Sequence, residues 1–117
     1  MKEEQLNESI LLSVREGLDS DSYYDNRLIM FINTVFATLS QLGVGPEDGF
    51  SISGTNETWN DFLSGTDNAK EIFNMVQTYM LLKVRLLFDP PQSSAVANAI
   101  AESAKEYEWR LKKESDY

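Results

Sequence analysis

Apolar residues recur every three or four positions along most of this chain, which is the period of an α-helix that buries one face. The first such run comprises Leu6, Ile10, Leu11 and Val14. Gly17 follows it, and glycine commonly ends a helix. These positions predict a first helix over about residues 3–16.

A second run, longer and more regular, predicts a helix over about residues 23–42. Its apolar stripe comprises Leu28, Ile32, Val35, Leu39 and Leu42. Ser22 and Asp25 resemble a capping box, a pair of side chains that accept hydrogen bonds from each other's backbone N–H, and so mark the helix start. Gly43 marks its end.

The segment 43–67 is different in kind. Its glycines, its proline and its small polar residues are typical of a loop. It also holds large apolar side chains, namely Phe50, Ile52, Trp59, Phe62 and Leu63. Large apolar side chains are not typical of a flexible linker. We therefore expect an ordered loop whose apolar side chains pack against the rest of the domain, with a short helical turn near Trp59–Leu63. A two-stranded hairpin around Phe50–Ile52 is the lesser alternative.

Two more helices are predicted in the C-terminal half. The third covers about residues 68–88 and is apolar over most of its circumference, as in a central helix or one that meets a neighbouring subunit. Asp89-Pro90-Pro91 then breaks the chain. The fourth covers about residues 92–113, and its apolar stripe comprises Val96, Ile100, Ala104, Tyr107 and Leu111. The alanines in its first half have small side chains, so a partner helix can approach this half closely.

These elements predict one all-α domain over residues 1–117, a small bundle of about four helices with a long ordered loop between the second and third. The chain has no cysteine and no histidine, which excludes a disulfide framework, a thiolate metal site and the commonest general base. The net charge is −9, and no run of Lys and Arg is present to bind nucleic acid. The polar first residues do not resemble a signal peptide and no stretch is apolar enough to span a membrane, so we expect a soluble cytoplasmic protein without a cofactor.

Two patterns resemble metal sites. Asp19-Ser20-Asp21 resembles the start of a calcium loop, but tyrosines occupy the next ligand position and the glycine position, which favours helix capping. Glu102 and Glu106 share a helix face, as magnesium ligands do, but no second acidic motif lies on another helix to close the site. We interpret that pair as a solvated face and predict no enzyme activity.

The candidate interface residues are aromatic or small. They are Trp59, Phe62, Tyr79, Ala97, Ala101 and Trp109. Trp109 lies about 160° from the apolar stripe of its helix, taking ~100° per residue, so it is either an anchor for a partner or covered by the N-terminal helix. For Trp59 and Phe62 the competing interpretation is that they anchor the loop within the subunit.

Two stretches, in this order and at this spacing, resemble a known family. The first comprises Tyr23-Tyr24-Asp25-Asn26, Leu39-Ser40-Gln41-Leu42-Gly43-Val44-Gly45-Pro46, Gly49-Phe50-Ser51-Ile52, and Trp59 with Asp61-Phe62-Leu63. The second comprises Val76-Gln77-Thr78-Tyr79, the run from Leu82 to Pro91, and Glu108-Trp109-Arg110-Leu111. Over about Asp19 to Leu111 the pattern resembles the small head–tail connector proteins of long-tailed bacteriophages and prophages, also called head-completion or portal-adaptor proteins.

The resemblance implies a structural subunit that assembles into a ring on the portal, with the portal's twelvefold symmetry. Such a ring extends the DNA channel, offers a surface to the next connector or tail protein, and lets DNA pass without sequence-specific binding. The protein would be made in the host bacterial cytoplasm and end at the head–tail junction of the virion. The apolar third helix and the alanine-rich fourth are candidate contact faces, and we expect acidic side chains to line the lumen.

Two other functions stay open on the sequence alone. One is a small acidic helical module, antitoxin-like or regulatory, that binds a basic partner. The other is an all-α nucleotide hydrolase that uses acidic residues and magnesium.

Overall fold

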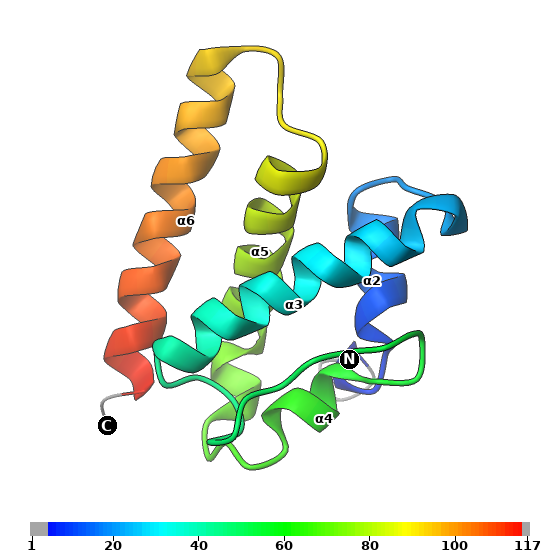
Figure 1. Cartoon of the computed structure of the whole chain (residues 1–117). Coiled ribbons are helices and arrows are strands. Elements are labelled where there is room, and N and C mark those ends of the chain that lie inside the picture. Colours follow the sequence, from blue (N-terminus) through cyan, green and yellow to red (C-terminus); the bar gives the residue numbers. More distant parts are fainter. Residues whose placement is uncertain (1–4, 116–117) are drawn as a thin grey trace.

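The computed structural model describes residues 5–115 and confirms the all-α class (Figure 1). Its helices are α2 (Ile10–Gly17), α3 (Asp25–Gln41), α4 (Trp59–Leu63), α5 (Ala69–Phe88) and α6 (Ser94–Ser115), with a 3-10 turn, η1 (Ser22–Tyr24), before α3. The described part of the chain has no strand, only an isolated bridge between Ser9 and Thr58. The hairpin considered around Phe50–Ile52 is therefore wrong, whereas the helical turn at α4 is confirmed.

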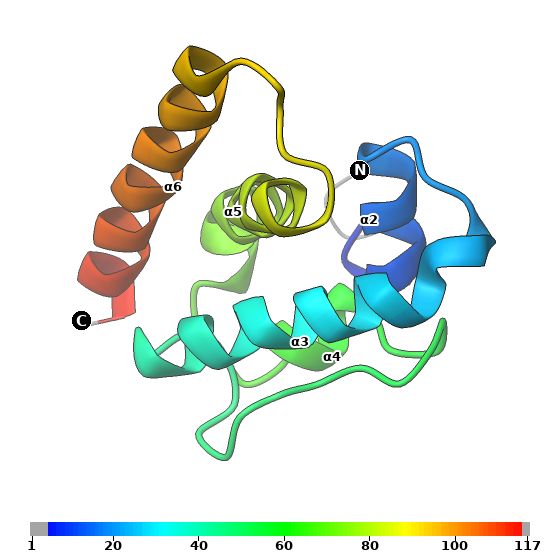
Figure 2. The same cartoon turned by 45° about the horizontal axis from the view of Figure 1, so that its top comes forward.

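α5 is the central helix, as its apolar circumference predicts. It packs against α2, α3 and α6, and both views of the ribbon show α3 crossing one side of α5 while α6 runs along another (Figures 1 and 2). Its buried residues are Ile72, Phe73, Val76, Tyr79, Met80 and Val84. α2 approaches closely at Gly17, where a Cβ would lie only 2.7 Å from Leu81 Cδ2.

α3 buries its predicted stripe. Its buried residues are Leu28, Ile32, Val35, Phe36 and Leu39. The helix ends in a Schellman motif, in which the Val44 N–H donates to the Leu39 carbonyl at 2.9 Å and the Gly43 N–H donates to the Ser40 carbonyl at 3.0 Å. The stop signal predicted at Gly43 is thus confirmed.

The glycine-rich loop is pinned to α3 by aromatic rings and by one amide side chain. Phe50 and Phe62 pack against Phe36, with ring centroids 5.0 and 4.7 Å from that of Phe36. The Asn33 Nδ2 donates to the Ile52 carbonyl at 3.0 Å, and the Asn33 Oδ1 accepts from the Ile52 N–H at 2.8 Å. The loop is ordered because its backbone groups find partners on a helix, as a strand's would find them on a neighbouring strand.

The predicted first helix, 3–16, is interrupted: Gln5 and Leu6 are helical, but residues 7–9 are not. Residues 3 and 4 lie outside the described residues, and α2 begins at Ile10 because the Ser9 side chain caps it, accepting from the Leu12 N–H at 3.3 Å. The backbone around Ser9 turns to the loop instead: the Ile10 N–H donates to the Glu57 carbonyl at 3.0 Å and the Trp59 N–H to the Glu8 carbonyl at 3.3 Å. Hydrogen bonds to residues far along the chain therefore interrupt the helix just before Ile10.

The capping box predicted at the start of the second helix is also wrong. The Asp21 carboxylate accepts from the Tyr23 N–H at 2.9 Å and so caps η1, and no side chain caps α3 itself. Asp25 instead forms a two-bond ion pair with Arg15, the last basic residue of α2. This ion pair links the C-terminal end of α2 to the N-terminal end of α3. Both side chains are only 23% exposed.

Candidate docking surfaces

α6 is fastened to the body through its C-terminal half. Ala104 and Leu111 are buried in the core. The Tyr79 hydroxyl of α5 donates to Glu108 Oε2 at 2.7 Å, and Lys83 Nζ lies 3.7 Å from the same oxygen. Burial of Tyr79, together with this hydrogen bond and the negative charge of Glu108, raises the pKa of the phenol well above its ordinary value. This half of α6 is therefore held by both packing and polar contacts.

The N-terminal half of α6 leaves its apolar stripe partly uncovered. Between it and α5 lies a shallow groove of about 330 Å³, lined by Leu82, Ala95, Val96, Ala99, Ile100 and Ser103, which we call the α5/α6 groove. Val96 is 49% exposed, and Leu87 near the end of α5 is 45% exposed. The stripe predicted for the fourth helix is corrected accordingly: it reaches the core only in its later turns, and its first turns present apolar atoms to the surface.

A second surface lies on the outer side of η1 and α3. Tyr23, Arg27, Met30 and Thr34 recur there at helical spacing and are all exposed; we call them the α3 outer face. Tyr23 is 83% exposed and Met30 58%. Arg27 is the only Lys or Arg between Glu16 and Ala69, and its guanidinium forms no ion pair or hydrogen bond with residues 5–115. The sequence prediction missed this face, although an apolar Met and a lone Arg off the buried stripe were a signal for it.

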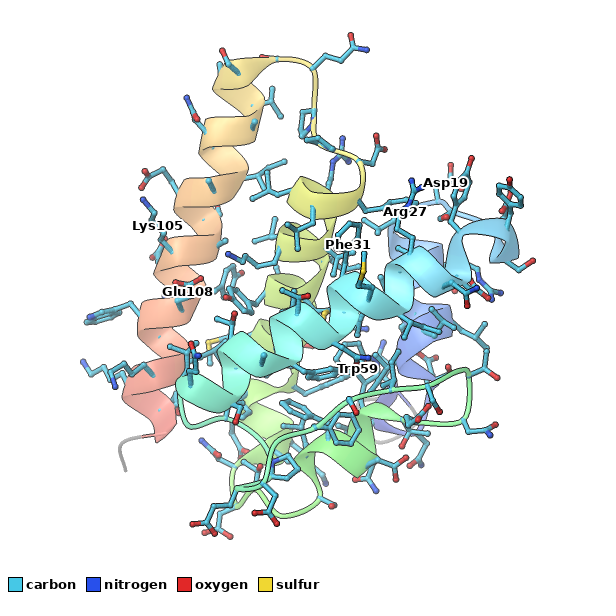
Figure 3. The ribbon with its side chains drawn as sticks, in the orientation of Figure 1. Asp19, Arg27, Phe31, Trp59, Lys105 and Glu108 are labelled. Carbon is cyan, nitrogen blue, oxygen red and sulfur yellow. The ribbon has the colours of Figure 1, made fainter. Side chains whose placement is uncertain are left out.

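Three of the six predicted interface residues lie inside the subunit. Trp59 and Tyr79 are 0% exposed and Phe62 is 1% exposed, so they present no surface to a neighbour in this structure. The Trp59 indole N–H donates to Ser13 Oγ at 3.1 Å, which joins α4 to α2 beneath α3 (Figure 3). The interpretation of Trp59 and Phe62 as loop anchors is therefore the one that the structure supports.

The other three predicted residues lie on α6. Ala97 and Ala101 are half-buried, on a side of the helix that the groove does not include. Trp109 is 64% exposed, and Lys113 Nζ lies 5.0 Å from its ring centroid. Of the two alternatives for Trp109, cover by the N-terminal helix is therefore wrong, and a role as an anchor for a partner stays a prediction.

The acidic patterns of the sequence make local contacts in the described part of the chain. Glu102 and Glu106 pair along their own helix with Lys105 at 4.0 Å and Arg110 at 2.7 Å. No group of carboxylates that could hold a metal ion is found within residues 5–115. Asp21 caps η1, in line with the capping interpretation of its motif. No helix in this range is long and apolar enough to cross a membrane.

Negative charge gathers on the part of the molecule formed by the loop and α4. Residues 28–69 contain no Lys or Arg, and their acidic residues are Glu47, Asp48, Glu57, Asp61 and Asp67. All of these except the half-buried Glu57 are exposed. This region therefore repels other polyanions.

The described residues form a small helical domain with a closed apolar core and with apolar side chains exposed on two surfaces. Comparison with protein-family models gives the family directly: the model described as phage connector protein matches residues 10–117. The chain belongs to the phage connector protein family, a family of structural proteins of the phage head–tail junction, as the sequence resemblance predicted. Neither the curated proteins nor the solved structures contain a match to this chain.

Proposed function

We propose that this protein is a head–tail connector subunit that assembles into a ring on the portal, extends the DNA channel and joins the head to the tail. The observation that carries the proposal is the match of the phage connector model over residues 10–117. The ring takes the portal's symmetry, which we expect to be twelvefold. The subunit is made in the host bacterial cytoplasm and ends in the virion.

The uncovered apolar surfaces support a subunit that works by association. A ring needs two different surfaces on each subunit, because each copy contacts one neighbour with one face and the other neighbour with another. The α5/α6 groove and the α3 outer face are two such surfaces. Trp109, exposed on the far side of α6 from the core, is a candidate anchor for the portal or for the next tail component.

The charge of the chain suits a channel that DNA passes through. A net charge of −9 repels phosphate, so DNA slides along the wall instead of binding to it. We propose that acidic side chains line the lumen, and the exposed carboxylates of the loop and α4 are the candidates. A ring structure whose lumen is basic would overturn this part of the proposal.

Size-exclusion chromatography with light scattering tests the proposal when the chain is mixed with the portal protein of the same phage. We expect many copies of the chain to elute with each portal, in the ratio of one per portal subunit. If the chain does not bind the portal and instead forms a stable one-to-one complex with a basic protein, this result would contradict the connector function. It would support an antitoxin-like module.

A further inference from the structure

The α5/α6 groove and the α3 outer face point in opposite directions. Met80 is buried in the core, and Leu82 at the groove stands about 160° away from it around α5, since each residue advances ~100°. The α3 outer face lies on the side of α3 that turns away from its own buried stripe. Figures 1 and 2 show α3 crossing one side of α5 while α6 runs along another. The two surfaces therefore cannot meet within one subunit.

The lining of the groove suits an apolar side chain from a second helix. The groove has an apolar floor, with little polar surface, and two of its lining residues are alanines, which let a second helix approach closely. The α3 outer face has two exposed large hydrophobic side chains, Tyr23 on η1 and Met30 on α3 itself, which are 83% and 58% exposed. Methionine is flexible and fills irregular apolar hollows well.

Charged side chains that can pair with each other lie beside both surfaces. Ser103, at one end of the groove, also borders a hollow lined by Glu102, Lys105 and Glu106, so this rim of the groove carries two carboxylates and one ammonium group. Those carboxylates are 76% and 61% exposed and pair only with cations of their own helix. Such exposed pairs contribute little to stability, so the two carboxylates can exchange partners. On the opposite surface Arg27, three residues before Met30, lines a hollow with Asp19 and Asp89 but forms no ion pair within residues 5–115, so its positive charge can take a new partner.

We propose that the α3 outer face of one copy docks into the α5/α6 groove of the next, with Met30 on the apolar floor and Arg27 against the Glu102–Glu106 rim. This contact is heterologous and leaves a free groove at one end of a pair and a free α3 outer face at the other, so it propagates until the ring closes. The inference rests on the proposed ring function and assigns the faces that build it.

Engineered disulfides test the contact, because the chain contains no cysteine of its own. Met30→Cys and Val96→Cys are combined in one chain, the variant is assembled with the portal as the wild type is, and the assembly is oxidised. We expect a ladder of covalent multimers in denaturing electrophoresis. The matched control pairs Val96→Cys with Leu12→Cys, since Leu12 is 43% exposed but lies on α2, away from the proposed contact, and it should give no ladder.

Charge exchange gives an independent readout. Arg27→Glu should weaken assembly about tenfold, because it sets like charges against each other, and Glu102→Arg with Glu106→Arg in the same chain should restore it. Circular dichroism checks that each variant keeps its helical content. Rings that assemble normally without a Met30–Val96 link, or that tolerate Arg27→Glu, overturn the assigned faces while the connector function stands. If the wild type forms no ring on the portal, the connector function itself fails.

Discussion

The Tyr79 hydroxyl donates a hydrogen bond of 2.7 Å to Glu108, and through it the fully buried middle of α5 holds the C-terminal half of α6. Lys83 lies 3.7 Å from the same carboxylate oxygen. No comparable polar contact fastens the N-terminal half of α6 within the described residues. The arrangement fixes one half of the helix and leaves the other half free to present the α5/α6 groove.

Replacing Tyr79 by Phe should lower the free energy of unfolding at pH 7 by about 1 kcal/mol, the usual net value of a hydrogen bond. The larger value for a bond to a charged group is not expected, because the Glu108 side chain is 31% exposed. Urea unfolding of both proteins measures the difference. Tyr23→Phe is the matched control, since Tyr23 is 83% exposed and its loss should change stability little.

The same pair predicts how stability changes at alkaline pH. The pKa of Tyr79 is raised in the folded protein, so above about pH 10 the unfolded chain loses the tyrosine proton while the folded chain keeps it. Stability from this group is therefore complete below about pH 10 and falls above it, by up to about 1.4 kcal/mol per pH unit. Tyr79→Phe lacks this loss, so the advantage of the wild type should shrink between pH 10 and 11. An advantage that is constant from pH 7 to 11 would contradict the assignment.

Alanine substitutions at three glycines of the loop should change the free energy of unfolding to different extents. Gly45 has φ of +93° and a Cβ there would lie 2.3 Å from Phe62 Cε1, whereas Gly49 has φ of +91° with no atom within 4 Å. Gly49→Ala should therefore cost only the left-handed backbone strain, about 1–2 kcal/mol. Gly45→Ala should cost more, because Phe62 is buried and cannot move aside. Gly65→Ala, with open space and no left-handed φ, should be neutral; chemical denaturation that ranks the three otherwise would refute the loop packing.

The two tryptophans should behave as opposites. Trp59→Ala removes a buried ring and the bond to Ser13, and should cost about 3–5 kcal/mol. Trp109→Ala removes an exposed ring and should change the free energy of unfolding by less than about 0.5 kcal/mol. Fluorescence separates the two without unfolding: the Trp109→Phe protein, which keeps only Trp59, should emit at shorter wavelength and resist acrylamide quenching. Easy quenching of that protein would show that the Trp59 indole is not buried against α2 and α5.

The contact of Asn33 with Ile52 predicts a local effect on the loop. Asn33→Ala leaves the Ile52 N–H and carbonyl without the partners at 2.8 and 3.0 Å, which should cost about 1–3 kcal/mol. Hydrogen exchange should speed up at Ile52 and its neighbours, while the amides of α5 change only as far as global stability does. Equal acceleration across the molecule would mean that Asn33 supports the whole fold and not this loop in particular.

The sequence predicted the parts of this fold that depend on local period. The stripe of α3, the apolar circumference of α5 and the turn at Trp59 all follow from spacing that neighbouring residues determine. The break before Ile10 could not be predicted in this way, because its cause is hydrogen bonding with Glu57 and Trp59, far along the chain. The same limit applies to the site: an apolar spacing marks Val96 as a core position, and only packing shows that α5 leaves it uncovered.

Electron cryomicroscopy of the chain assembled on the portal of its own phage tests the central claim most directly. We predict a closed ring of identical helical subunits, one per portal subunit, stacked on the portal around an open channel. Particles that show a bare portal, or isolated subunits bound without contact to one another, would contradict it.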